Sequence, residues 1–330
     1  MAAIYCPRHK IAVASSFEGI VNNGATECAL TSYNAYSQME EGGGKFFNRV
    51  IDPADFQSIR HHEYVEAFLA LRPLVEVAED YLTVLQLIEL CPNEVKNMLN
   101  KPQDEESYRP LTDKFHELKA EHSDLRNRFG KGKDSAFYRE RDRMQAKDMT
   151  AWMGTQEPYE DSITQFRLLV KTQERDEGAE NAYRAVKSGF APWFATSKDE
   201  GSTYLLCKIY SGSNRMAPDD IAEDGRKICI ISRDRLIGME TVPDRDKIKQ
   251  LTIIAEKEEI PHGQVWRLND RYDTKQQIEL RDAGFQTQFI VPGYMFPHDI
   301  RKAKEDPNLI VLDRRQFAGQ LAKFAMDWGY

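Results

Sequence analysis

Cysteine is scarce in this chain, and the few cysteines lie far apart. There are five in 330 residues: Cys6, Cys28, Cys91, Cys207 and Cys229. An odd number without short spacings excludes a cysteine metal site and a disulfide framework. We therefore expect the reducing environment of the cytoplasm.

Long apolar runs and an excess of positive charge are also missing. No run approaches the roughly 20 apolar residues that a membrane helix needs, and residues 1–10 lack the apolar stretch of a signal peptide. The formal net charge of -8 argues against a general polyanion binder such as a nucleic-acid-binding protein. What the chain does have is 41% hydrophobic residues, enough for a core, so we expect no membrane association.

Two stretches of the sequence predict a parallel α/β sheet. Lys10 to Ser16 reads as a short buried strand. After about residue 175, short apolar strands at 192–195, 227–231, 264–268, 287–291 and 309–312 alternate with helices at 178–187, 200–210, 246–258 and 274–283. Such alternation favours right-handed crossovers between parallel strands. The first strand is too apolar to stand alone, so we expect it to join this sheet.

The sequence between these two stretches is helical and charged. A first helix is predicted by the apolar stripe Leu74, Val77, Ala78, Tyr81, Leu85 and Ile88, and a second by Phe115, Leu118, His122, Leu125 and Phe129, ending at Gly130. A third runs from about 135 to 152, with Met144, Ala151 and Trp152 facing inward. Gly42 to Gly44 reads as a flexible joint. The predicted domains are an α/β core of residues 1–22 and 175–330, and a helical insertion of residues 23–174.

The insertion also carries a run of basic residues. They are Arg126, Arg128, Lys131, Lys133, Arg139, Arg141 and Arg143, and acids interrupt them. A salt-bridged helix face is the favoured interpretation, and an anion or nucleic-acid patch is the alternative.

The residues that follow the predicted strands carry the candidate chemistry, because ligands of parallel sheets bind at the carboxyl ends of the strands. Ser16-Phe17-Glu18-Gly19-Ile20 follows the first strand. It resembles the first motif of haloacid-dehalogenase-like (HAD-like) phosphatases, in which an apolar strand precedes D-x-D-G-T.

Three further segments continue this resemblance in the same order. Thr196, in Phe-Ala-Thr-Ser-Lys, is similar to the second motif, Lys247 to the third-motif lysine and Asp270 to the fourth-motif acid. The resemblance is to phosphoglycolate-phosphatase-like members with a helical cap and covers about residues 8–22 and 175–330. It implies a HAD-like Rossmannoid core with an all-helical cap inserted after the first strand.

The resemblance also implies a role for each matching residue. The catalytic positions are Ser16, Glu18, Thr196 and Lys247, and the positions that bind a phosphoryl group are Ser16, Gly19, Thr196, Ser197 and Lys247. Asp270, with Asp273 as a weaker candidate, would hold Mg²⁺. The ligand would be a phosphorylated or otherwise anionic small molecule, bound between core and cap.

Two departures from the family pattern bear directly on catalysis. Ser16 stands where the family has the aspartate that attacks phosphorus, and an uncharged serine would need an adjacent base. Its lack of charge also weakens the expected Mg²⁺ site, since this ion prefers charged oxygen ligands. Glu18 replaces the second aspartate and reaches about 1.5 Å further.

Each site residue also has a purely structural interpretation. Ser16 can be a strand-end serine satisfied by backbone groups, and Glu18 a remnant surface acid. Lys247 can be a solvated lysine at a helix start, and Asp270 can cap the helix that begins near Thr274.

Three functional hypotheses follow. The first is a HAD-like protein of impaired catalysis that binds an anionic ligand. The second is an active Mg²⁺-dependent phosphatase or hydrolase of altered mechanism, in which Glu18 activates water. The third is a structural protein that binds a partner through its charged cap.

Overall fold

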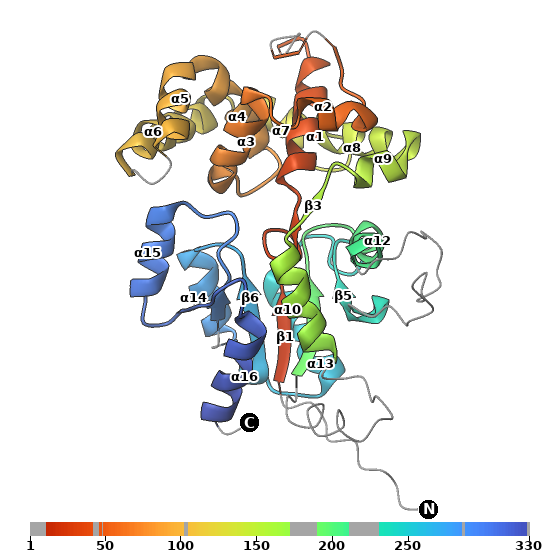
Figure 1. Cartoon of the computed structure of the whole chain (residues 1–330), viewed down its shortest axis with the longest axis vertical. Helices are drawn as coiled ribbons and strands as arrows, with labels where there is room; N and C mark the ends of the chain where they lie inside the picture. The colour runs from red at the N-terminus through yellow and green to blue at the C-terminus, as the bar shows by residue number, and fades with distance from the viewer. Residues whose placement is uncertain are drawn as a thin grey trace, which may run out of the picture. The chain divides into compact units, whose positions relative to one another are not determined.

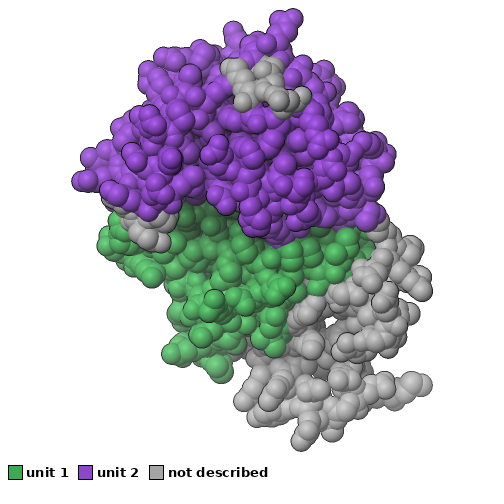
Figure 2. All heavy atoms as spheres, turned by 45° about the horizontal axis from the view of Figure 1, so that its top comes forward, with its two compact units in different colours: residues 1–22, 158–295, 299–330 green, residues 23–157, 296–298 purple. Residues whose placement is uncertain are grey.

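The computed structural model describes residues 11–41, 46–47, 49–101, 105–171, 190–210, 231–285 and 288–328. The chain forms two compact units, coloured separately in Figure 2. Unit 1 comprises residues 1–22, 158–295 and 299–330, and unit 2 comprises residues 23–157 and 296–298. The short strands β2 (Asn22–Asn23) and β3 (Glu157–Pro158) pair with each other. The chain leaves unit 1 within β2 and returns to it within β3.

Unit 1 contains a six-stranded parallel sheet in the order β5-β4-β1-β6-β7-β8 (Figure 1). The strands are β1 (Ile11–Ser15), β4 (Phe190–Ala195), β5 (Leu236–Ile237), β6 (Val265–Asn269), β7 (Gln288–Ile290) and β8 (Ile310–Val311). β1 lies in the middle, between β4 and β6, and all five of its residues are buried. The sequence prediction of a Rossmann-like α/β sheet that includes the first strand is therefore confirmed.

Six helices of unit 1 lie between its strands or after the last of them in the described chain. They are α10 (Glu160–Lys171), α12 (Glu200–Tyr210), α13 (Lys247–Glu258), α14 (Thr274–Asp282), α15 (Pro297–Glu305, in unit 1 from residue 299) and α16 (Phe317–Asp327). Short 3-10 turns lie at Arg233–Arg235 and His262–Gln264.

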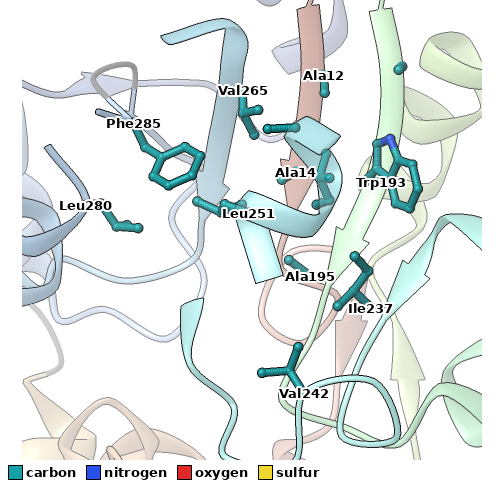
Figure 3. Close-up of a cluster of buried hydrophobic side chains, with 13 residues drawn as sticks. Ala12, Ala14, Trp193, Ala195, Ile237, Val242, Leu251, Val265, Leu280 and Phe285 are labelled. Atoms are coloured by element: carbon teal, nitrogen blue, oxygen red, sulfur yellow. The ribbon is translucent and has the colours of Figure 1, made fainter. Parts of the chain in front are cut away.

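The two faces of the sheet are covered by different helices. On one face, Ala12, Ala14 and Val265 pack in a buried cluster with Leu251 of α13 and Leu280 of α14 (Figure 3). On the other face, Phe166 of α10 contacts Phe194 and Phe317, with ring centroids 4.8 and 5.3 Å away. Coverage on both faces explains why these parallel strands read as continuous apolar runs.

The predicted elements of unit 1 agree with the structure to within two residues at each end where both can be compared. The predicted strands at 192–195, 264–268, 287–291 and 309–312 are β4, β6, β7 and β8. The helix at 178–187 and most of the strand at 227–231 lie outside the described residues. β5, α15 and α16 were not predicted.

Helix α10 belongs to unit 1, whereas the sequence analysis placed residues up to 174 in the insertion. Its aromatic contacts explain the assignment, and so does Gln165, whose Oε1 accepts a hydrogen bond from the Ala318 backbone N–H at 3.1 Å.

Unit 2 is helical. Its helices are α1 (Ala25–Ser37), α2 (Phe56–Ile59), α3 (Glu63–Leu71), α4 (Asp80–Leu90), α5 (Pro92–Asn100), α6 (Glu105–Glu121), α7 (Ser123–Gly130), α8 (Ala136–Lys147) and α9 (Met149–Met153), with 3-10 turns at Pro53–Asp55 and Arg72–Leu74. Gly42 to Gly44 lie outside the described residues. Across the parts of the chain described in both units, no helix has the length and apolar character to span a membrane.

The first predicted helix of the insertion is shorter than its apolar stripe suggested. α4 begins only at Asp80, so Val77 lies in the preceding turn and is 47% exposed. The stripe prediction holds for Tyr81, Leu85 and Ile88, which are buried on α4.

The second and third predicted helices are each two helices. A break at His122 separates α6 from α7, which ends at Gly130 as predicted. A break at Asp148 separates α8 from α9, because the Asp148 side chain caps α9 by accepting from the Ala151 N–H at 2.9 Å. Met144 and Trp152 are fully buried.

Candidate functional site

The loop after β1 is held against the end of β6 through Ser16. The Ser16 N–H donates to the Leu268 carbonyl at 3.0 Å, and its hydroxyl donates to Asn269 Oδ1 at 3.4 Å. The hydroxyl partner is a neutral amide oxygen, which cannot take up the serine proton as a general base would. Ser16 is half-buried, and its position is that of a strand-end serine linking two neighbouring strands.

Gly19 allows this loop to approach the end of β6 closely. Its φ of +78° is in the left-handed region, which glycine adopts readily. A Cβ on Gly19 would lie 2.2 Å from Asp270 Oδ2, and one on Gly293 would lie 2.1 Å from the Gly19 carbonyl oxygen. Gly19 therefore brings the backbone of the first loop against the buried carboxylate of Asp270.

Glu18 is part of a hydrogen-bonded group that joins three segments of unit 1. Its carboxylate accepts from Lys198 Nζ at 2.8 Å and from Asn22 Nδ2 at 3.0 Å to each oxygen. Tyr210, at the end of α12, donates in turn to Asn22 Oδ1. Lys198 is buried, so Glu18 is the ionic partner of an interior cation and its carboxylate is already engaged.

Thr196 lies at the end of β4 and is buried. Its N–H donates to the Ile237 carbonyl at 2.9 Å, and its hydroxyl oxygen accepts from the Lys198 N–H at 3.1 Å. The hydrogen of the Thr196 hydroxyl is not used in this bond, so it could donate to a ligand. Ser197 is exposed.

Lys247 is the first residue of α13, which Asp246 caps by accepting from the Ile248 N–H at 2.8 Å. Its ammonium group turns inward and donates to the Ala195 carbonyl at 2.7 Å and to Gln250 Oε1 at 2.8 Å. Burial, with a contribution from the charge of Arg267, lowers the Lys247 pKa to about 7, although Asp270 opposes the shift. The two hydrogen bonds of its ammonium group do not fit the interpretation of Lys247 as a solvated lysine.

β6 and the residue that follows it supply one buried aspartate and one buried arginine. Asp270 is only 6% exposed, and Arg267, three residues earlier, only 4%. Arg267 was not a candidate in the sequence analysis, although an arginine within an apolar strand is itself a signal, because charged residues are seldom buried unpaired.

Asp273 has a structural role at the start of α14. Its side chain is the N-cap and accepts from the Gln276 N–H at 3.0 Å. The helix cap that the sequence analysis offered for Asp270 is thus provided by Asp273, which is exposed.

Asp270 and Asp273, the two residues predicted to hold magnesium, do not form a suitable donor set, and the neighbouring Glu18 and Ser16 do not complete it. Glu18 is paired with Lys198, Asp273 caps α14, and Ser16 brings no charge. Over the described parts of the chain, no three or more His, Cys, Asp or Glu residues are grouped so that they could hold a metal ion. Asp270 alone would supply one carboxylate, and Mg²⁺ sites usually need more oxygen ligands than that.

The basic run of unit 2 is largely used in ion pairs within that unit. Arg126 pairs with Asp80, Arg128 with Glu41 at 2.5 Å, Arg141 with Glu27 at 2.7 Å and Arg143 with Glu140 at 2.7 Å. These contacts agree with the favoured interpretation of a salt-bridged helix face, although three of the four acids, Asp80, Glu27 and Glu140, are buried.

The predicted site residues Ser16, Glu18, Gly19, Thr196, Lys247 and Asp270 therefore lie at the carboxyl ends of β1, β4 and β6, together with Lys198. Arg267 lies within β6, two residues before its end. Comparisons of the chain with protein-family models, with curated proteins and with solved structures returned no match. The resemblance to HAD-like phosphatases thus stays a prediction based on four short motifs.

Proposed function

We propose that unit 1 binds a small phosphorylated or otherwise anionic ligand at the carboxyl ends of β1, β4 and β6 and does not hydrolyse it. The observation that carries this proposal is the inward-facing ammonium group of Lys247, which donates to the carbonyl of Ala195, the residue directly before the buried Thr196. A buried cation is stabilised by an opposite charge, and the hydroxyl hydrogen of Thr196 can donate to the same anion.

The balance of charge around Lys247 supports an anionic ligand. Glu18 and Lys198 neutralise each other through their 2.8 Å contact. Asp270 remains as the acid that interacts electrostatically with both Lys247 and Arg267. Asp273 also acts on Arg267, but it is exposed and caps α14. A bound anion would therefore add negative charge beside Lys247 when Lys247 is protonated.

Two features argue against hydrolysis by this site. An aspartate at position 16 would be the nucleophile of a HAD-like phosphatase, and Ser16 has only the amide oxygen of Asn269 as its hydroxyl partner. Glu18, the base of the alternative hydrolase, is held by Lys198 and Asn22.

The absence of hydrolysis is tested with p-nitrophenyl phosphate in the presence of Mg²⁺. We expect the wild-type protein to release p-nitrophenol no faster than buffer does. Ser16→Asp and Glu18→Gln are assayed beside it. A wild-type turnover that Glu18→Gln abolishes would contradict the proposal and support the altered hydrolase, whereas turnover only in Ser16→Asp would show that serine is what prevents hydrolysis.

The pKa of Lys247 predicts how anion binding depends on pH. Below about pH 7 the lysine is already protonated, so the affinity for sulfate should be nearly constant. Above this value, binding must first add a proton to Lys247, so the affinity should fall by about tenfold per pH unit. Sulfate is the suitable probe because its own charge does not change over this range. Titration calorimetry from about pH 6 to about pH 9 measures the profile, and an affinity that rises above neutrality would rule out this role for Lys247.

A further inference from the structure

Arg267 is a charged residue in the interior of unit 1, on a strand that is otherwise apolar up to its end. Its register partners are Ala14 on β1 and Gln288 on β7. It lies on the same face of β6 as Val265, the face that α13 and α14 cover. One of its nitrogens, Nη2, donates to Gln276 Oε1 of α14 at 2.6 Å.

The other terminal nitrogen of Arg267 has no acceptor. Nη1 is buried and makes no hydrogen bond to any residue that the structure describes. Burial lowers the Arg267 pKa to about 10, and the nearby Asp270 opposes this shift, so the guanidinium stays charged at neutral pH. An interior charged donor without a partner is costly, which indicates that an acceptor from outside the protein completes the site.

Two acids act electrostatically on Arg267: Asp270, and the exposed helix cap Asp273. Asp270 interacts electrostatically with both Arg267 and Lys247. An aspartate at position 16 would bring another carboxylate to this edge, but the residue there is Ser16, whose hydroxyl donates a hydrogen bond to Asn269. A divalent cation placed beside Asp270 would also meet the positive charges of Arg267 and of protonated Lys247, so repulsion would oppose its binding.

We infer that Arg267 supplies, as part of the protein, the positive charge that a divalent cation would otherwise bring to this edge of the sheet, so that the anion binds without metal. The inference rests on the proposed function, since it concerns the same anion. It assigns a binding role to Arg267, with Nη1 as the donor to a ligand oxygen and Gln276 as the group that orients the guanidinium.

Sulfate titration calorimetry on the whole protein tests this assignment, first in EDTA and then with excess Mg²⁺. We expect the two dissociation constants of the wild-type protein to agree within about twofold. Arg267→Met should weaken sulfate binding in EDTA by at least about tenfold, the loss of one charge-assisted hydrogen bond. Lys275→Met is the matched control, because Lys275 is an exposed cation on α14, and it should bind as the wild type does.

The possible failures of this experiment are distinguishable. Two results would overturn the inference but not the proposed anion site. The first is sulfate binding that requires Mg²⁺. The second is a folded Arg267→Met variant that binds sulfate with the affinity of the wild type. No sulfate binding in either buffer would overturn the proposed function together with the inference. The comparison of the two buffers uses only wild-type protein, so it decides whether the anion needs a metal even if Arg267→Met does not fold. Arg267→Lys, which keeps the charge but not the second nitrogen, then tests the role of Arg267 and should also weaken sulfate binding.

Discussion

Replacing Gly19 with alanine should destabilise unit 1 by at least about 3 kcal/mol, more than backbone strain alone would cause. The new methyl group would lie 2.2 Å from Asp270 Oδ2 and 2.6 Å from its Cβ, so the first loop and the end of β6 could not both keep their positions. The positive φ of Gly19 adds roughly 1 kcal/mol. Urea unfolding followed by tryptophan fluorescence measures the change in the free energy of unfolding.

Gly132→Ala is the matched control for this substitution. Gly132 has a φ of +79°, almost that of Gly19, but nothing lies within 4 Å of the Cβ that alanine would add. It should therefore show only the backbone term, about 1 kcal/mol. Equal losses for the two variants would mean that the contact between Gly19 and Asp270 does not exist in solution.

Removing Arg141 should destabilise unit 2 by about 3–5 kcal/mol, since it would leave an interior carboxylate without its counter-charge. Glu27 on α1 is completely buried, and Arg141 on α8 donates to its two oxygens at 3.0 and 2.7 Å. Thr31 and Trp152 donate to the same carboxylate at 2.6 and 3.4 Å. Arg141→Met removes the charge, and because Trp152 touches the network, its fluorescence can report the unfolding of this unit.

A second substitution separates the ion pair from the packing around it. Glu27→Leu combined with Arg141→Met removes both charges, and it should recover part of the stability that Arg141→Met loses. Arg128→Met, which breaks the more exposed pair with Glu41, should change stability little. If Arg141→Met were as mild as Arg128→Met, the ion pair between Arg141 and Glu27 would not be a main contribution to the stability of unit 2.

The sequence predicts the sheet of unit 1 well because its strands are apolar along their whole length. β1 and β4 are buried on both faces, so their sequences need no alternation to be recognised. β5 has only two residues and gives no such signal. α16 carried a signal that was missed, since Phe317, Leu321 and Ala325 recur every four residues and are all buried.

The candidate site could be predicted in its position but not in its contacts. The rule that ligands bind at strand ends located Ser16, Thr196 and Lys247 correctly at one edge of the sheet. Spacing along the chain could not show that Glu18 pairs with Lys198, because 180 residues separate them. Nor could it show that the ammonium of Lys247 points inward, since a lysine at a helix start is exposed in most proteins.

Titration calorimetry of sulfate at slightly acidic pH, with EDTA present, tests the central claim most directly. The wild-type protein and Lys249→Met should bind one sulfate with equal affinity, since Lys249 is exposed and pairs with Asp244. Lys247→Met, two residues earlier on the same helix, should lose this binding. Equal sulfate binding by Lys247→Met and the wild-type protein would contradict an anion site built around Lys247.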